Sequence, residues 1–298
     1  LMSGVNVKMV FSASGLLRDT SMSFELNPNQ LMFKEDFEYP QGLLLNTTGS
    51  YSSLANTGSN NITVSSSSLS YSNYQSSGVG NSISIINTAT GENLSRSFTH
   101  SPISSGTLYL SMMVNVSSPG STGSYFFSLQ SGTSTTYAGR VFIKPATGGF
   151  IIAVTKGNAT PVYSTQVYTL NTTHFIVLKY TFNSGTTTDD NIKLFVDPTL
   201  GTSTEPTALL SVDNTTITDP TSLSNIYIRQ GGATGPALVM DGIRIGSTWQ
   251  SVTPIVLETP PTLSPATNAN VDNPFIVSFI DNPTWRSAIS SVKIGSST

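Results

Sequence analysis

Carboxylates are the side chains best able to do chemistry in this sequence, and three of them lie within KEDFEYPQG at residues 34–42. These are Glu35, Asp36 and Glu38, in a chain of 298 residues with only 16 acidic side chains. Carboxylates at i, i+2 and i+4 of a strand project from one face, where they could flank a scissile glycosidic bond. Glu35 and Glu38 are three positions apart and would face opposite sides of a strand. The cluster therefore does not predict a glycosidase.

Nucleophilic and phosphate chemistry also lack their motifs. The two histidines, His100 and His174, have no carboxylate nearby in sequence, and no Gly-x-Ser-x-Gly segment is present. A histidine at a strand edge, bonded to a backbone group, accounts for each of them more simply. No glycine-rich loop leads into a predicted helix. We therefore predict that the chain is not an enzyme.

The composition points to an extracellular β-protein. Charged residues make up 10% of the chain, against about 25% in average soluble domains. The chain has no cysteine, which excludes disulfides and thiolate metal sites. The net charge of −3 without a basic run argues against a nucleic-acid partner. No stretch approaches the roughly 18 apolar residues that span a bilayer. We expect a secreted or surface-exposed protein, present here as a piece of a longer chain.

Short apolar runs separated by Gly, Asn, Ser and Pro predict strands throughout the sequence. PATGG (145–149) and NSGTTTDDN (183–191) predict hairpin loops. Alternation is clearest in TLYLSMMVNV, where one face carries Leu108, Leu110, Met112, Val114 and Val116. Strands at this spacing without intervening helices predict an all-β fold, an antiparallel two-sheet jelly-roll sandwich.

Proline spacing predicts the domain boundaries. Residues 253–274 contain five prolines and predict an extended linker. Residues 34–252 form the predicted sandwich. Residues 1–33 are β-like, and they are either the tail of a preceding module or an added strand. Residues 275–298 predict the start of an Ig-like β-module that is cut off.

From about Phe37 to Val252 the chain resembles the laminin-G-like, concanavalin-A-like jelly rolls in secreted proteins of Bacteroidetes-type bacteria. The likeness is carried, in order and spacing, by EDFEYPQGLL, SGVGNSISI, SRSFT, GTLYLSMMVNV, GRVFIK, LNTTHFIVLKYTF, KLFVDPTLG, IYIRQG and MDGIRIGSTW. The tail DNPFIVSFIDNPTWRSAISSVKIG is similar to a small Ig-like module repeated in bacterial surface proteins.

This resemblance implies a structural Ca²⁺ between the approach to the first strand and an aspartate on the last strand. Hard cations take oxygen ligands. Asp241, in MDGIRIG, lies inside an apolar strand, where an unpaired carboxylate costs several kcal/mol. Its partner is either Ca²⁺, held with Glu38 and with Asp36 as a weaker candidate, or Arg244 in a salt bridge, or a turn hydrogen bond.

Sugar binding is the other common role in proteins of this resemblance, and sugars are held by aromatic stacking and hydrogen bonds. Aromatic residues that either bind a ligand or fill the rim of the sandwich are Tyr51, Tyr71, Tyr74 and Tyr137.

These observations predict a non-catalytic extracellular module of a bacterial surface or secreted protein. Its expected work is adhesion or glycan binding, with a glycan or a cell-surface or matrix protein as partner. One alternative is a structural subunit of an extracellular fibre or sheath that pairs strands with copies of itself. Another is an accessory domain of a secreted hydrolase whose catalytic part lies outside this chain.

Overall fold

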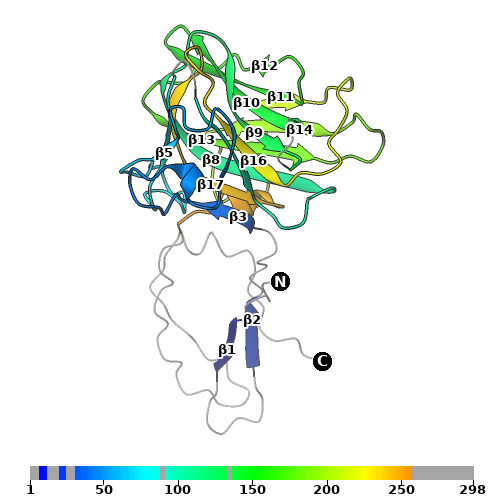
Figure 1. The fold of residues 1–298 in the computed structure, drawn as a ribbon. Coiled ribbons are helices and arrows are strands. Elements are labelled where there is room, and N and C mark those ends of the chain that lie inside the picture. The colour runs from blue at the N-terminus through cyan, green and yellow to red at the C-terminus, as the bar shows by residue number, and fades with distance from the viewer. Residues whose placement is uncertain (1–6, 12–19, 25–30, 88–90, 133–135, 257–298) are drawn as a thin grey trace. The chain divides into compact units, whose positions relative to one another are not determined.

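The predicted strands form two stacked antiparallel sheets in a computed structural model (Figure 1). The structure describes residues 7–11, 20–24, 31–87, 91–132 and 136–256. The chain divides into two units: one comprises Leu1–Asn29 with Ile255–Thr298, and the other is Gln30–Pro254. In the first unit, β1 (Val7–Phe11) and β2 (Thr20–Phe24) pair antiparallel. The predicted Ig-like module, and nearly all of the predicted linker, lie outside the described residues.

The seven-stranded sheet has the order β12-β11-β10-β9-β16-β7-β4. Its middle is made by β10, β9 and β16, which come from distant parts of the sequence. The PATGG segment forms the predicted turn between β10 and β11, because Ala146 pairs with Gly149. The strands are β12 (Val162–Tyr163), β11 (Gly149–Lys156), β10 (Tyr137–Ala146), β9 (Ser124–Gln130), β16 (Asn225–Arg229), β7 (Asn93–Ser97) and β4 (Ser52–Ala55).

The eight-stranded sheet has the order β15-β14-β13-β8-β17-β6-β5, and β3 also pairs with β17. The long strands β13, β8 and β17 run side by side at its centre (Figure 1). The strands are β15 (Leu210–Val212), β14 (Asn191–Val196), β13 (Thr173–Thr181), β8 (Thr107–Ser118), β17 (Ala237–Gly246), β6 (Ile83–Ile85), β5 (Thr63–Val64) and β3 (Leu31–Glu35).

Alternation along the strands builds the main core between the sheets. All five residues predicted to share one face of β8 lie in that core, from Leu108 to Val116. Opposite them, β16 contributes Ile226 and Ile228. The all-β, two-sheet jelly-roll prediction is therefore confirmed. Residues 45–47 form a single 3₁₀ turn (Leu45–Thr47), and α1 (Trp249–Val252) is a short helix. Among the described residues, no helix has the length and apolar character needed to cross a membrane.

The outer face of the eight-stranded sheet carries a second, smaller core. Tyr109 of β8 and Phe175 of β13 project outward and are buried there. Trp249 of α1 and Tyr74 from residues 66–80 pack on them, and we call these two segments the cover. Because the cover packs on Tyr109 and Phe175, these outward side chains are not accessible to a ligand.

Candidate functional site

The first carboxylate of KEDFEYPQG, Glu35, lies in the interior and pairs with Arg96 of the opposite sheet. Its Oε1 accepts the N–H of Phe37 at 2.8 Å, and its Oε2 accepts the hydroxyl of Tyr51 at 3.1 Å. The Arg96 guanidinium carbon also lies 4.9 Å from the ring centroid of Phe33. Glu35 therefore ties the two sheets together.

Asp241 lies on the outward side of β17 and is fully buried beneath the cover. Its Oδ2 accepts the N–H of Leu69 at 2.7 Å, and its Oδ1 accepts the N–H of Gly242 at 2.6 Å. Burial raises the pKa of Asp241 to about 8 against the effect of these two hydrogen bonds, and the nearby charge of Asp36 adds to the rise. Gly242 allows this arrangement because its φ is +58°, and a Cβ there would lie 2.8 Å from the Met113 methyl carbon.

The predicted metal ligands separate into buried and exposed groups. Asp36 is 4% exposed, and its carboxylate oxygens have no hydrogen-bond partner, although Lys34 pairs with it. Glu38 is exposed. Arg244 donates to Ser76 and Gln75, so the alternative salt bridge to Asp241 does not form. Asp36 and Asp241 fit a hard cation by donor type, because both supply buried carboxylate oxygens, and those of Asp36 have no hydrogen-bond partner.

A second carboxylate group lies in the 183–191 hairpin loop and beside it. Ligand oxygens of Asp189, Asp190 and Asp219 lie within 4.8 Å of one another. Lys156, which is 1% exposed, places its Nζ 2.5 Å from Asp219 Oδ1 and donates to the Thr188 carbonyl at 2.8 Å. The buried ammonium therefore supplies positive charge at this cluster.

His174 is held on both ring nitrogens. Its Nδ1 lies 2.7 Å from Asp197 Oδ2, and its Nε2 lies 3.1 Å from the Thr169 carbonyl oxygen. Burial lowers the pKa of His174, but the hydrogen bonds and the charge of Asp197 outweigh it and raise the pKa overall. With both nitrogens engaged, this histidine has a structural role.

The four predicted ligand-binding tyrosines do not form one site. Tyr51 is 4% exposed in the main core, and Tyr74 is fully buried beneath the cover. Tyr71 packs on Phe175, with ring centroids 5.3 Å apart. Tyr51 and Tyr74 are buried and have no ring face left for a sugar, whereas Tyr71 and Tyr137 are half-buried and lie on opposite faces of the sandwich.

Tyr137 belongs to an aromatic cluster on the outer face of the seven-stranded sheet. Its ring centroid lies 5.6 Å from that of Tyr125 and 5.4 Å from that of Tyr227. The ring centroids of Tyr125 and Phe142 lie 5.4 Å apart. Tyr125 and Tyr137 are half-buried, so parts of their rings remain accessible.

Two β-bulges bring these side chains to one face. The register of β10 against β9 shifts between Tyr137 and Arg140 and again between Val141 and Phe142. Tyr137 and Arg140 are three positions apart, so regular alternation would place them on opposite faces. An extra residue in an antiparallel pair re-aims the side chains that follow it. The bulges therefore create a surface that a regular hairpin would lack.

Two arginines complete this surface. The Arg229 guanidinium carbon lies 4.5 Å from the Tyr125 ring centroid, and that of Arg140 lies 5.1 Å from the same ring. The Arg140 guanidinium carbon also lies 5.2 Å from the centroid of the Phe142 ring. Cation–π contacts of this kind hold a guanidinium in a fixed position while it stays charged. We call this surface the tyrosine–arginine face; it consists of Tyr125, Tyr137, Tyr227, Phe142, Arg140 and Arg229.

Burial sets the protonation of these groups. Burial, followed by the hydrogen bond and charge of Tyr137, raises the pKa of Tyr125 to about 12. Burial also raises the pKa of Tyr227. It lowers the pKa of Arg140, but a guanidinium titrates so far above neutrality that it remains a cation. At neutral pH the face therefore offers neutral hydroxyls and positive charge.

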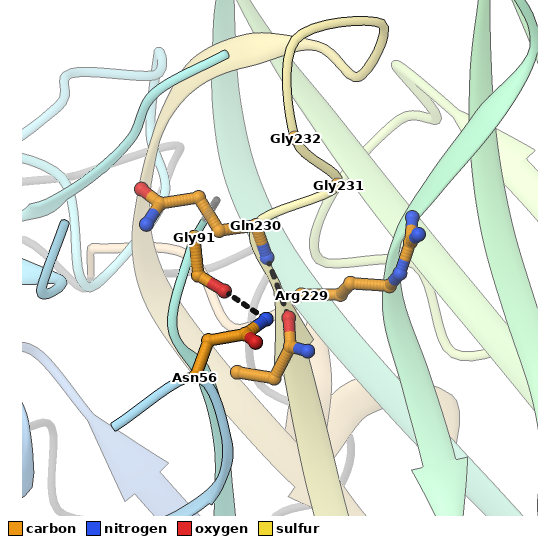
Figure 2. Close-up of a pocket in the computed structure, with 7 residues that line it drawn as sticks. Asn56, Gly91, Arg229, Gln230, Gly231 and Gly232 are labelled. Atoms are coloured by element: carbon orange, nitrogen blue, oxygen red, sulfur yellow. Dashed lines mark hydrogen bonds between the residues drawn. The ribbon is translucent and has the colours of Figure 1, made fainter. Parts of the chain in front are cut away.

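A polar pocket adjoins this face (Figure 2). Its volume is about 240 Å³, and its lining includes Asn56, Asn93, Arg229 and Gln230. The Asn56 Nδ2 donates to the Gly91 carbonyl at 2.8 Å, which fixes one wall. Figure 2 shows the Arg229 side chain pointing away from Asn56. Its Nη1 donates a hydrogen bond to the backbone carbonyl of Tyr125 at 3.2 Å. Arg229 thus links the pocket to the aromatic cluster.

The sequence reading missed five members of the tyrosine–arginine face. The available signal was period-2 spacing within strands: Arg140 and Phe142 are two apart in GRVFIK, and Tyr227 and Arg229 are two apart in IYIRQ.

No protein-family model and no curated protein sequence matches this chain. Among solved structures, the globular domain of T. cruzi calreticulin is 14% identical, with a TM-score of 0.48, over 75% of this chain and 90% of that one. The endo-β-1,4-glucuronan lyase of Trichoderma reesei is 11% identical, with a TM-score of 0.48, over 75% and 98%. An alginate lyase, Aly36B, is 13% identical, with a TM-score of 0.46, over 72% and 96%.

These likenesses concern sheet architecture and assign no ligand to this chain. They do correct one prediction, because the statement that the chain is not an enzyme is overturned by the polysaccharide lyases among the neighbours. That statement rested chiefly on the missing carboxylate pattern of hydrolases. A lyase adds no water across the bond it breaks, so the missing pattern does not exclude activity. The laminin-G-like resemblance, the bacterial origin and the extracellular location stay predictions.

Proposed function

We propose that the tyrosine–arginine face binds a carbohydrate chain. The observation that carries this proposal is the half-exposed pair Tyr125 and Tyr137, held against Tyr227 on the outer face of a rigid sheet. Aromatic side chains on soluble proteins usually bury their rings, so an outward cluster with accessible rings favours a ligand that covers them.

The chemistry of this face suits a sugar. A sugar ring has an apolar face that packs on an aromatic ring, and hydroxyls around its edge that need hydrogen-bond partners. The hydroxyls of Tyr125 and Tyr227, whose pKa values are raised, stay protonated at neutral pH and can donate hydrogen bonds. Arg140 and Arg229 add further donors beside the rings.

The layout of this face favours an extended chain over a single sugar. From Asn93 of β7 to Tyr163 of β12 the outward side chains cross six neighbouring strands. Strands lie about 4.8 Å apart, so this row spans roughly 24 Å. At the far end of the row, the Lys144 Nζ lies 5.1 Å from the centroid of the Tyr163 ring. A polymer crossing the strands would contact several of these side chains together.

The proposed function is tested with an array of neutral and acidic glycans, followed by arginine footprinting. The glycan bound most tightly should slow the reaction of phenylglyoxal with Arg140 and Arg229, as measured by peptide mass spectrometry. Polymer length in the same samples shows whether the glycan is also cleaved. Absence of binding across the array, or binding that leaves both arginines equally reactive, would contradict the proposal.

Calcium is proposed separately as a structural ion. Asp36 and Asp241 are the residues that would hold it, because both are buried and their charges act on one another. The ion would relieve the repulsion between the two carboxylates near the base of the cover. It is not required at the tyrosine–arginine face.

A further inference from the structure

We infer that the carbohydrate bound on the tyrosine–arginine face is acidic, and that Arg140 and Arg229 pair with its carboxylates. This inference rests on the proposed function and narrows it from carbohydrates in general to uronate polymers.

The distribution of charge is the first argument. The strands of the seven-stranded sheet contain no Asp or Glu, although the whole chain carries a net charge of −3. The basic residues of these strands are Arg96, Arg140, Lys144, Lys156 and Arg229. Arg96 and Lys156 have carboxylate partners. Within the part of the chain that the structure describes, the three outward cations have none.

The position of Arg229 is the second argument. Its Nη1 donates to Ser124 Oγ at 2.9 Å and to the Tyr125 carbonyl at 3.2 Å. A Cβ on Gly231 would lie 2.7 Å from this Nη1, so a larger residue at 231 would displace the guanidinium from its present position. The bonds among the described residues all use Nη1. A guanidinium has five N–H groups, so the others remain available to a carboxylate.

Arg140 is held in a similar way two strands away. Its Nε donates to Thr155 Oγ1 at 3.2 Å, and its guanidinium lies among the rings of Tyr125, Tyr137 and Phe142. Tyr125 also hydrogen-bonds this guanidinium, and the rest of its five N–H groups can reach a ligand. Since β9 separates β10 from β16, the two arginines sit on strands roughly 10 Å apart. Two fixed cations at this separation suit acidic groups repeated along a polymer.

The pocket beside Arg229 supplies room for one acidic sugar unit. Its walls are amides, glycines and the Arg229 stem, which suit hydroxyls and a carboxylate better than an apolar group. The pocket and the aromatic cluster meet at Arg229 (Figure 2). A sugar unit in the pocket would therefore lie next to the unit that stacks on Tyr125.

The test compares probes that differ in the carboxylate. β-1,4-Glucuronan oligosaccharides and cello-oligosaccharides of equal length share their linkage, and calorimetry measures the affinity for each. Alginate and polygalacturonate, each before and after carboxyl reduction, widen the comparison. We expect at least one acidic probe to bind roughly tenfold or more tightly than its neutral counterpart, with affinity falling as salt rises.

Variants locate the effect. Arg140→Gln and Arg229→Gln should each lower the affinity for that acidic probe roughly tenfold while leaving neutral probes nearly unchanged. Arg229→Lys should retain more affinity for the acidic probe than Arg229→Gln but less than the wild type, because an ammonium cannot pair with a carboxylate in the bidentate manner of a guanidinium. Lys193→Gln on the other sheet removes the same charge and should have no effect. Unchanged melting temperatures confirm that the variants are folded.

The outcomes separate this inference from the proposed function. Equal binding of acidic and neutral probes, lost in Tyr137→Ala, would overturn the acidic specificity and leave carbohydrate binding standing. No binding of any sugar probe would overturn both. Polyglutamate, an acidic polymer without sugar rings, tests charge alone. If it binds as tightly as the uronate, or if Lys193→Gln weakens binding as much as Arg229→Gln, the arginine-specific site is contradicted.

Discussion

The two sheets of this sandwich both carry tyrosines on their outer faces, but the chain covers these faces differently. On the eight-stranded sheet, the cover packs on Tyr109 and Phe175 and buries its own Tyr74 completely. On the seven-stranded sheet, Tyr125 and Tyr137 stay half-buried beside two arginines. The same residue type thus stabilises the fold on one face and remains available to a ligand on the other. The deciding feature is the segment that lies over it.

The largest expected effect concerns the cover and its buried carboxylate. An acid whose pKa rises on folding binds its proton more tightly in the folded protein. The stability linked to Asp241 is therefore complete below about pH 4 and is lost as pH rises toward about 8. The unfolding free energy of metal-free protein should fall by up to about 1.4 kcal/mol per pH unit in this window.

Denaturant unfolding across this pH range measures the effect, and Asp241→Asn should flatten the curve. If Asp36 and Asp241 hold Ca²⁺, adding the ion at pH 8 should raise the melting temperature, EDTA should reverse the rise, and Asp241→Asn should abolish the response. A wild-type curve as flat as that of the variant would contradict the account of Asp241. Insensitivity to both Ca²⁺ and EDTA would exclude the metal.

Tyrosine truncation should affect stability very differently on the two faces. Tyr74 is fully buried, and its hydroxyl donates to the Gly242 carbonyl at 2.8 Å. Tyr74→Ala should cost about 3–5 kcal/mol of unfolding free energy, as large core truncations do. Tyr137→Ala loses only partial ring contacts and should cost about 1 kcal/mol. Urea unfolding measures both, and equal losses would remove the distinction between the faces.

Removing an interior arginine and removing an outer-face arginine should also change the unfolding free energy by different amounts. Arg96 lies inside the sandwich with Glu35, and removing one partner leaves the other charge buried. Arg96→Ala should cost about 3 kcal/mol, whereas Arg229→Ala on the outer face should cost under about 1 kcal/mol. Adding Glu35→Gln to Arg96→Ala should recover part of the loss. A large stability loss in Arg229→Ala would mean that this arginine serves the fold.

The fold was predictable because alternation is a local property of each strand. The inward set of β8, from Leu108 to Val116, follows from period 2 alone, and the structure confirms it. The two hairpin loops follow from their turn residues. Burial of Asp241 was also predictable, since a carboxylate in an apolar strand needs partners. Its partners, the N–H groups of Leu69 and Gly242, were not, because Leu69 lies 172 positions away.

The candidate site was less predictable because it depends on bulges and on the cover. Loop aromatics such as Tyr71 and Tyr74 suggested a ligand site, but long-range packing on Phe175 uses them. The strand SYFFSLQ breaks simple alternation, since Phe126 and Phe127 are both fully buried. Only the register shift between β9 and β10 explains how Tyr125 then faces outward beside Phe142. Such a shift cannot be read from a single strand.

The central claim is that the tyrosine–arginine face, and not the covered face, binds carbohydrate. Its most direct test compares Tyr137→Ala with Tyr71→Ala, since both tyrosines are half-buried and they lie on opposite faces. Calorimetry with the glycan that wild-type protein binds most tightly gives the affinity of each variant. Tyr137→Ala should weaken binding about tenfold, and Tyr71→Ala should leave it unchanged. Loss of affinity in Tyr71→Ala with full affinity in Tyr137→Ala would contradict the claim.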